Sequence, residues 1–322
     1  MRIAVLVVNG VTDSGLGLLR DVFAAADLLA GRIDEHIEAF EVTLLATHPQ
    51  VRTGYGLTAV AEPLAGVGDN PPDHLLVPSL GLLDADDLVR SAADSDTLED
   101  LRTAHEHGVA VGAACSGTLL LAEAGLLVGR AATTSWWLGP TFRARYPDVL
   151  LDESQALVVS DTVTTAGAAL AHLDLALSLV RRVSPWLADA VSDYLAVGDR
   201  PQQGDLARPT LLATSDPILV AFDRAVRDQL AGPIDIARLA PNLGVSQRTL
   251  QRLTATVLGM TPVHYVQQVR LERAVDLLRT TNLSLTTVAH AVGYGDGTTL
   301  GTLLRRRRGT TPEQVRRRQR HR

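Results

Sequence analysis

Apolar residues in the C-terminal third of the chain recur at helical spacing, and they do so twice. Four residues stand at positions i, i+3, i+4 and i+7 in each copy, namely Ile236, Leu239, Ala240 and Leu243 in the first and Leu285, Val288, Ala289 and Val292 in the second. This spacing predicts one buried stripe on a helix. A glycine, Gly244 or Gly293, then lets the chain turn sharply. A second helical run follows, from Gln247 in the first copy and from Thr298 in the second.

A helix, a tight turn and a second helix are typical of the helix-turn-helix, which presents its second helix to the major groove of DNA. Two copies about 50 residues apart argue against a chance match. Pro241 falls inside the first predicted helix, where it removes a backbone hydrogen bond. We therefore expect that helix either to kink or to begin later.

The first two thirds of the chain alternate between apolar runs and helical segments. The apolar runs predict buried strands at 2–8, 40–47, 74–79 and 109–114. Helical segments are predicted around 18–29, near 84–107, over 168–183 and over 186–197. This alternation predicts an α/β domain with a parallel sheet sandwiched by helices, of the flavodoxin-like kind.

Polar residues with Gly and Pro at 198–209 predict a linker after this domain. We therefore expect an α/β sensor domain over 1–197, a linker over 198–214, and an all-α domain of two helix-turn-helix motifs over 215–322.

The charges divide along the same boundary. Residues 1–210 hold 13 Arg and 28 Asp or Glu, whereas residues 211–322 hold 17 Arg and 8 acidic residues. The net charges of −15 and +9 add up to the −6 of the whole chain. An acidic front and a basic back indicate a sensing half and a half that binds nucleic acid.

Composition excludes several classes of protein. The chain is 46% apolar and 20% charged, as in globular proteins, and no apolar run approaches the ~18 residues that span a bilayer. The N-terminus predicts a first strand rather than a signal peptide, so we expect a cytoplasmic protein. The single cysteine cannot form an internal disulfide. His105 and His107 would face different sides of a helix, which argues against a shared metal, and we expect neither metal nor cofactor.

The repeat and its flanks resemble the DNA-binding domain of the AraC/XylS transcription regulators, over about residues 215–318. The marks of that family are the pair Gly293-Tyr294, the closing string GTTP at 309–312, and the linker-helix residues Arg270, Arg273, Ala274, Leu277 and Leu278. A rigid linker helix would let two recognition helices of one chain enter successive major grooves, about 34 Å apart.

The sole cysteine stands between a predicted strand and a predicted helix, in the string Ala113-Ala114-Cys115-Ser116-Gly117. These small residues permit the sharp strand-to-helix turn of a nucleophile elbow. Such a turn lies at the carboxyl end of a parallel strand, where α/β proteins bind ligands. The helix N-terminus beyond it would favour the thiolate.

The front half resembles the ThiJ/PfpI, class I glutamine-amidotransferase-like superfamily, over about residues 2–195. The matching strings are ACSGTLLLAEAGLLVGRAATTSWW, at 114–137, and RYPDVLLDESQALVVSDTVTTAGAALAHLDLALSLVRR, at 145–182. Joined to an AraC-type domain, the chain is similar to the GlxA-type transcriptional regulators over nearly its whole length.

That resemblance implies that two residues, a histidine base and an acidic residue, should assist the cysteine. This sequence has neither of them at the expected positions. Ser135 stands where a histidine base is usual, and serine cannot serve as a base near neutral pH. Gly15 stands where an acidic residue is usual. We therefore expect no catalysis and a vestigial nucleophile position at Cys115. The candidate ligand-binding residues are Cys115, Ser116, Gly81, Ser135, Trp136 and His172, with Trp136 and Trp137 facing opposite ways if they lie in a strand.

The first recognition helix carries the side chains best suited to reading bases. Ser246 predicts its N-cap, and the outer face holds Gln247, Arg248, Gln251 and Arg252. Arginine can bind guanine bidentately and glutamine can pair with adenine. The second recognition helix offers Thr298, Thr299, Thr302, Arg305 and Arg306, and we expect it to contribute mainly phosphate contacts. Leu300 and Leu304 replace the phenylalanines usual in the family.

These observations favour a sequence-specific transcriptional regulator that binds operator DNA, senses an unknown small-molecule effector near Cys115, and forms a homodimer, with no membrane partner. One alternative is a cysteine hydrolase or amidase with an added nucleic-acid domain, which the residues at 135 and 15 disfavour. Another is a thiol-based redox regulator, which requires an exposed thiol of low pKa.

Overall fold

The computed structural model describes residues 1–65, 67, 71–81, 84–198, 203, 216–308 and 310–320. The chain divides into two compact units, Met1–Gly204 and Asp205–Arg322, here called the N-terminal and C-terminal units. Of the predicted linker over 198–214, only residues 198 and 203 are among those described, so most of that segment lies outside the described residues.

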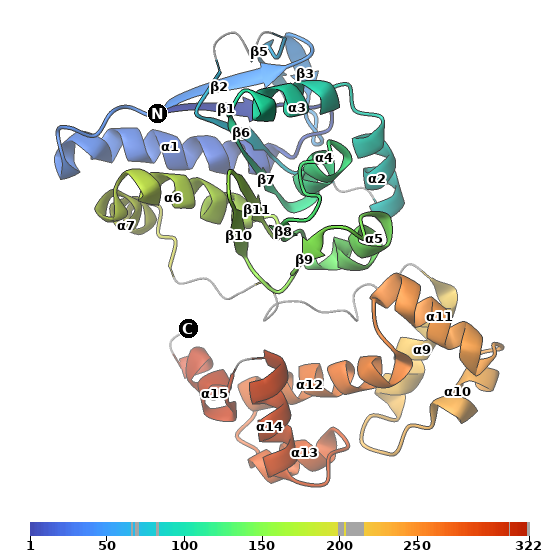
Figure 1. Ribbon diagram of the computed structural model, residues 1–322. Coiled ribbons are helices and arrows are strands. Elements are labelled where there is room, and N and C mark those ends of the chain that lie inside the picture. The colour runs from blue at the N-terminus through green and yellow to red at the C-terminus, as the bar shows by residue number, and fades with distance from the viewer. Residues whose placement is uncertain are drawn as a thin grey trace. The chain divides into compact units, whose positions relative to one another are not determined.

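A seven-stranded sheet forms the centre of the N-terminal unit (Figure 1). Its strands in spatial order are β10 (Leu157–Ser160), β11 (Val163–Ala166), β7 (Ala110–Ala114), β6 (His74–Val77), β1 (Arg2–Leu6), β2 (Glu41–Ala46) and β5 (Glu62–Pro63). Neighbouring strands run parallel except for β10 and β11, which pair antiparallel. The four strands predicted from the apolar runs are confirmed as β1, β2, β6 and β7.

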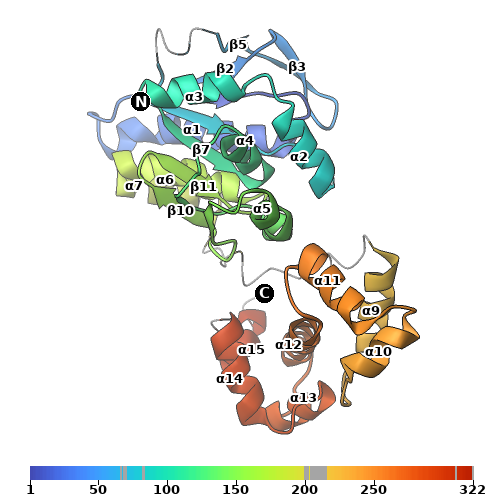
Figure 2. The same ribbon diagram turned by 45° about the vertical axis from the view of Figure 1, so that its right-hand side comes forward.

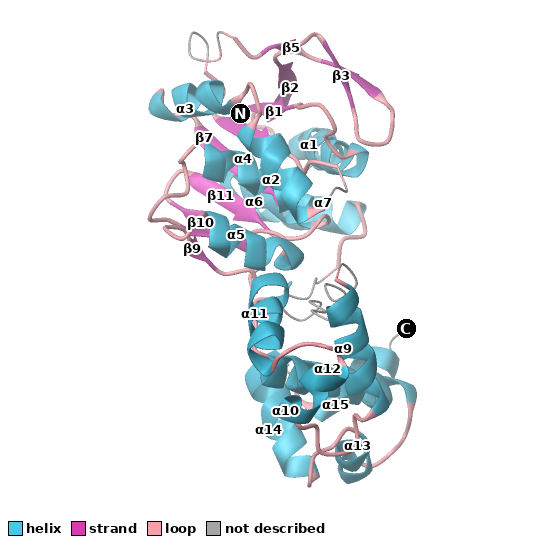
Figure 3. Cartoon of the chain, turned by 90° about the vertical axis from the view of Figure 1, so that its right-hand side faces the viewer, coloured by secondary structure: helices cyan, strands magenta, loops and turns pink. Residues whose placement is uncertain are grey.

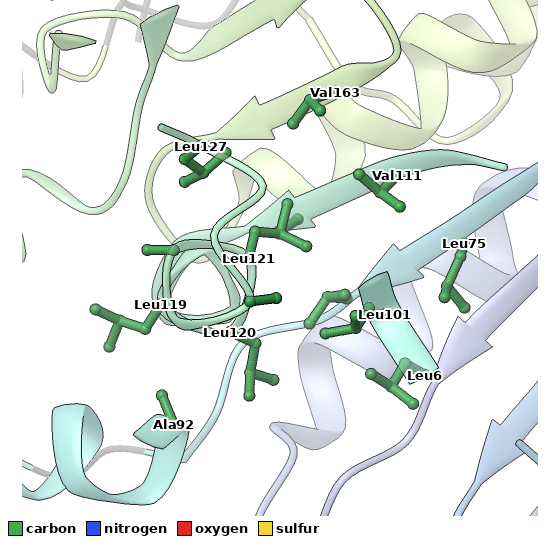
Figure 4. Close-up of a cluster of buried hydrophobic side chains, with 14 of the residues drawn as sticks. Leu6, Leu75, Ala92, Leu101, Val111, Leu119, Leu120, Leu121, Leu127 and Val163 are labelled. Atoms are coloured by element: carbon green, nitrogen blue, oxygen red, sulfur yellow. The ribbon is translucent and has the colours of Figure 1, made fainter. Parts of the chain in front are cut away.

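Helices cover both faces of this sheet (Figure 3). One face carries α1 (Asp13–Ile33), α6 (Ala171–Val183) and α7 (Pro185–Tyr194), and the other carries α2 (Ala85–Ala93), α3 (Leu98–Glu106) and α4 (Thr118–Glu123). Successive residues of β1 alternate between the two cores, with Ile3 packing toward α1 and Ala4 toward α4. Figure 4 shows the leucines of α4 in the same cluster of buried side chains as Leu75 and Val111 of the sheet. The flavodoxin-like fold predicted for this half is confirmed.

Several short elements of the N-terminal unit were not predicted. They are the sheet strands β5, β10 and β11, the hairpin of β3 (Gln50–Arg52) and β4 (Thr58–Val60), the pair β8 (Ala131–Ala132) and β9 (Leu150–Leu151), the 3-10 turns η1 (Cys115–Gly117) and η2 (Trp136–Leu138), and α5 (Gly139–Arg145). Trp136 and Trp137 lie in η2 and not in a strand, so the condition under which they would face opposite ways is not met.

The described residues of the C-terminal unit form helices and loops (Figure 3). The helices are α9 (Pro217–Asp228), α10 (Ile236–Asn242), α11 (Gln247–Leu258), α12 (Pro262–Thr280), α13 (Leu285–Ala291), α14 (Gly297–Arg308) and α15 (Pro312–Arg320). Figure 2 shows α12 between α9–α11 on one side and α13–α15 on the other. Two hydrophobic cores result, and α12 contributes Val269 to the first and Leu271 to the second.

Pro241 does not delay the start of its helix. Asp235 caps α10 by accepting a hydrogen bond from the backbone N–H of Ala237 at 2.9 Å, and Pro241 falls in the last turn. The missing backbone donor therefore concerns only the end of a short helix. Across the described residues, no helix has the length and apolar character needed to cross a bilayer.

Candidate functional site

Cys115 stands at a strained turn directly after β7. Its φ is +56°, in the left-handed region that side chains other than glycine rarely adopt. Two residues later, a Cβ added at Gly117 would lie 2.4 Å from the carbonyl oxygen of Pro78 and 2.6 Å from that of Val77. Only glycine fits here, because the backbone at 117 packs directly against the backbone at the end of β6. The chain therefore enters α4 through a sharp turn, as the small residues around Cys115 predict.

Hydroxyl groups surround the cysteine. The Ser135 Oγ lies 2.9 Å from the Cys115 Sγ. The hydroxyls of Thr118 and Thr134 both donate to the carbonyl oxygen of Cys115, at 2.7 and 3.1 Å. Cys115 as a whole is 8% exposed, and Ser135 is fully buried. None of these hydroxyls can take a proton from the thiol near neutral pH.

Burial raises the pKa of the Cys115 thiol, and it outweighs the hydrogen bonds from Ser135 and Ser116 that act in the opposite direction. We expected the N-terminus of the following helix to favour the thiolate, but the pKa of the thiol is raised and the thiol form is favoured. Desolvation disfavours the charged form of a buried thiol, and α4 has only six residues with which to oppose it.

The thiol is consequently expected to resist alkylation in the folded protein. We expect iodoacetamide at pH 7.5 to label the native chain at least about tenfold more slowly than the chain unfolded in urea, because thiolate is the reactive form. Mass spectrometry of the single cysteine gives both rates, and Cys115→Ser supplies the blank. Equal rates in the two states would show that the thiol is accessible and its pKa is not raised.

His172 holds the loop 78–81 that follows β6. Its Nε2 accepts from the backbone N–H of Ser79 at 3.0 Å, and its Nδ1 donates to the carbonyl oxygen of Ala169. The ring is fully buried, and burial lowers its pKa to about 4. His172 is therefore neutral near pH 7 with both nitrogens engaged, so neither is free to accept the proton of the thiol.

Gly15 lies against the same histidine. A Cβ at Gly15 would lie 2.6 Å from the Thr12 Oγ1 and 2.7 Å from the His172 Nε2. Thr12 in turn makes a short hydrogen bond with the hydroxyl of Ser79. The space beside Gly15, where the resemblance implied an acidic side chain, is thus filled by the side chains of Thr12 and His172, which anchor loop 78–81.

The remaining candidate residues of this unit surround the turn in different ways. The Ser116 hydroxyl donates to the carbonyl oxygen of Leu80 at 3.1 Å and accepts from its N–H at 3.0 Å, which ties the turn to loop 78–81. Gly81 is half-buried, and an added Cβ there would lie 3.1 Å from the carbonyl oxygen of Gly10. Trp136 is half-buried in η2. Within the described ranges, no group of three His, Cys, Asp or Glu could hold a metal ion.

Gln203 is a residue of this site that the sequence reasoning missed. Its Nε2 donates to the carbonyl oxygens of Thr134, at 2.8 Å, and of Glu153, at 2.7 Å. Its Oε1 accepts from the backbone N–H of Trp136 at 3.1 Å. The side chain is only 4% exposed. Its position in a polar stretch with Gly and Pro gave no signal of this burial.

A separate groove of about 780 Å³ runs between α1, β2 and the β3–β4 hairpin. Asp13, Arg20 and Asp27 line it together with Phe40 and other apolar residues, and Cys115 does not. The turn at Cys115 and this groove are therefore distinct features of the N-terminal unit.

In the C-terminal unit, α11 presents the side chains predicted to read bases. Ser246 caps it, as predicted, by accepting from the backbone N–H of Thr249 at 3.0 Å. Leu250 is fully buried in the first core. The four exposed candidates on the outer face are Gln247, Arg248, Gln251 and Arg252. Neither Arg248 nor Arg252 forms a salt bridge with another of the described residues.

The helix α14 is built differently. Leu300 and Leu304, at the positions where the resemblance implied phenylalanines, are fully buried in the second core. The exposed candidates are Thr298, Thr299, Thr302, Arg305 and Arg306. The hydroxyl of Thr299 donates to Asp296 at 2.9 Å, so it is engaged at the start of the helix.

Arg270 of α12 joins the two helix-turn-helix motifs. Its Nη2 donates to the carbonyl oxygen of Gly232 at 2.6 Å, and its guanidinium lies 5.7 Å from the centre of the Tyr294 ring. Gly293, with φ +82°, lets the second turn approach these groups. The arginine thus contacts the loop before the first motif and the turn of the second, which limits their movement relative to each other.

Comparison with known proteins finds matches to both halves. Residues 1–182 match the DJ-1/PfpI family, and residues 239–318 match a family described as a helix-turn-helix domain. A solved ThiJ/PfpI family protein from Pseudomonas syringae is similar with a TM-score of 0.51 and 21% identity, covering 70% of this chain and 86% of that one. At that identity the likeness shows the fold alone.

Two curated relatives extend over both halves. The HTH-type transcriptional regulator CdhR of Pseudomonas aeruginosa is 32% identical over 220 residues, which are 67% of this chain and 65% of that relative. The HTH-type transcriptional regulator GlxA of Rhizobium meliloti is 28% identical over 327 residues, which are 98% of this chain and 96% of that relative. The chain thus matches just under two thirds of the length of CdhR and nearly all of GlxA.

Proposed function

Because the chain belongs to the DJ-1/PfpI family and carries a helix-turn-helix domain at 239–318, we propose that it is a DNA-binding transcriptional regulator that recognises a specific operator. The relatives named as HTH-type transcriptional regulators, one of which matches this chain over nearly its whole length, support this proposal. The observation that carries it is the outer face of α11, where exposed arginine and glutamine side chains follow a capped helix start. These are the side chains that pair bidentately with guanine and adenine.

The N-terminal unit would serve as the sensor. Its role as a binding domain rather than an enzyme is supported by the surroundings of Cys115, where Ser135 replaces a base and His172 has both nitrogens engaged. The regulator names of the relatives fit a protein that is not an enzyme. Neither the hydrolase nor the redox alternative gains support, because the thiol is buried and its pKa is raised.

The effector would bind close to the turn at Cys115 and change the spacing of the two DNA-binding units of a homodimer. An isologous dimer with two-fold symmetry is the commonest soluble assembly, and it would place two operator half-sites in symmetric positions. The effector can shift the equilibrium only by its differential affinity for the two arrangements. Because the relatives named as regulators come from bacteria, the regulator would act in the cytoplasm, where bacterial DNA lies.

Selection of genomic fragments by the purified full-length chain tests this proposal. We expect an enriched motif with paired half-sites when binding is measured near physiological salt, since phosphate contacts depend strongly on ionic strength. Binding without any enriched motif, with and without cell extract as a source of effector, would contradict a specific operator.

Within that motif, Arg252→Ala is expected to relax specificity at one base pair. A lost bidentate contact lowers discrimination by about 1–3 kcal/mol at that position. Arg305→Ala, the matched variant on α14, is expected to weaken binding to all sequences equally and to reduce the salt dependence. Competition binding against single-base operator variants measures both effects. A uniform loss of affinity for Arg252→Ala would show that it contacts phosphate instead.

A further inference from the structure

The side chain of Gln203 occupies a small site built from main-chain groups. The site consists of the carbonyl oxygens of Thr134 and Glu153 and the backbone N–H of Trp136, with Gly167 as its floor. A Cβ added at Gly167 would lie 2.7–2.8 Å from the Nε2, Cδ and Oε1 of Gln203. The carboxamide of Gln203 therefore lies directly on this glycine, and we call the four-residue site the carboxamide site.

The polar groups of the site select one chemical class. Two carbonyl oxygens need a group with two N–H donors, and the N–H of Trp136 needs an acceptor. A carboxylate has no donor for the carbonyls, and a guanidinium or ammonium has no acceptor for the N–H. A primary carboxamide, or the closely similar urea group, satisfies all three positions. A mismatched group would leave buried main-chain atoms unpaired, which is costly.

The carboxamide site adjoins the turn at Cys115 through hydrogen bonds. Thr134 supplies a carbonyl to Gln203 and donates its hydroxyl to the carbonyl oxygen of Cys115. Ser135, the next residue, lies 2.9 Å from the thiol and 3.5 Å from the carbonyl oxygen of Gly167. A molecule bound in the carboxamide site would therefore contact the same short segment that surrounds the cysteine.

Gln203 also belongs to the segment that leads from the N-terminal to the C-terminal unit. We propose that Gln203 and the effector compete for the carboxamide site, so that the effector is a small molecule with a primary carboxamide or urea group. Its binding displaces Gln203, which stands two residues before the C-terminal unit begins at Asp205, and thereby changes operator affinity. The change in operator affinity rests on the proposed function. The chemical class of the ligand rests on the polar groups of the carboxamide site alone.

A side-chain analogue tests the site in the full-length protein. Gln203→Ala empties the carboxamide site without altering its main-chain groups, and propanamide matches the glutamine side chain that was removed. We expect propanamide to change the fluorescence of the adjacent Trp136 and Trp137 saturably in Gln203→Ala. The apparent Kd in the wild type is expected to be at least about tenfold weaker, because a tethered competitor has an effective concentration in the millimolar range.

Matched controls separate this result from general effects. Propanoate, which has the same shape but no N–H donor, is expected to give no saturable change. The double variant Gly167→Ala/Gln203→Ala is expected to lose propanamide binding, because the new Cβ occupies the floor of the site. No saturable change in Gln203→Ala, equal binding of propanoate, or equal Kd values in Gln203→Ala and wild type would overturn the carboxamide site.

Operator binding tests the coupling step separately. We expect Gln203→Ala to alter operator affinity by about fivefold or more, and Gln202→Ala, at the neighbouring glutamine in the sequence, to leave it unchanged. Propanamide binding without any change in operator affinity would overturn the coupling while leaving the ligand class intact. If neither the wild type nor the variants select an operator, the proposed function fails. The fluorescence titration with propanamide would still show whether the carboxamide site binds a ligand of this class.

Discussion

Replacing Gly293 by alanine is expected to reduce operator affinity about a hundredfold and to lower the free energy of unfolding of the C-terminal unit by about 2–4 kcal/mol. The residue has φ +82°, and a Cβ there would lie 2.5 Å from the carbonyl oxygen of Leu230 and 2.7 Å from the Arg270 Nη2. A backbone oxygen cannot move aside by rotating a side chain, so the loop at 230 must shift. Arg270 would then lose its hydrogen bond to Gly232, and the two recognition helices would lose their fixed spacing.

Gly295 supplies the matched control for this variant. It lies two residues further along, and a Cβ there would have no atom within 4 Å. We expect Gly295→Ala to bind the operator and to unfold like the wild type. Urea denaturation followed by circular dichroism gives the stability, and fluorescence anisotropy with operator DNA gives the affinity. If both alanine variants behaved alike, the close approach at 293 would have no energetic role.

Replacing Gly15 by alanine is expected to destabilise the N-terminal unit by about 2–4 kcal/mol, although alanine favours helices. The new Cβ would lie 2.6 Å from the Thr12 Oγ1 and 2.7 Å from the His172 Nε2, and both side chains are buried. Moving His172 would break its hydrogen bond to Ser79 and free loop 78–81. The variant should therefore also lose the response of operator binding to the effector.

The same substitution at Gly17, in the same helix, is expected to have the opposite effect on stability. No atom lies within 4 Å of a Cβ at Gly17, so Gly17→Ala should stabilise the unit by up to about 1 kcal/mol through helix propensity alone. Thermal unfolding of the two variants gives the comparison directly. A gain in stability for Gly15→Ala similar to that for Gly17→Ala would mean that Thr12 and His172 do not pack against the glycine as described.

The same contact predicts that placing an acidic residue at position 15 would not by itself create a catalytic site. A glutamate at 15 would require His172 to leave its buried position, and Ser135 would still stand where the base is expected. The sequence alone shows that both residues depart from the family pattern. The structure adds that Gly15 belongs to a packed polar arrangement with Thr12 and His172 that holds loop 78–81, whereas Ser135 contacts the thiol and the carbonyl oxygen of Gly167.

Some strands could not be predicted because their buried residues are polar. Thr164 and Thr165 of β11 are buried, which interrupts the apolar pattern that marked β1 and β7. The burial is tolerated because the hydroxyl of Thr165 accepts from the backbone N–H of Thr133 at 2.8 Å. The donor lies 32 residues away in the chain, so no local pattern could have revealed it.

By itself, the sequence determined the features that depend on neighbours within a few residues. The apolar stripes of α10 and α13, the cap at Ser246, the turn at Gly293 and the small residues around Cys115 are local, because helix periodicity and turn chemistry act over i to i+4. These features were enough to predict two helix-turn-helix motifs, an α/β half and the strained turn.

Only the tertiary structure decided how the distant groups act on one another. Gln203 meets Thr134 and Glu153 across 69 and 50 residues, and His172 meets Ser79 across 93. The raised pKa of Cys115 likewise follows from burial. Desolvation, close contact and the pairing of main-chain groups depend on what the fold brings together, and composition and spacing along the chain do not contain that information.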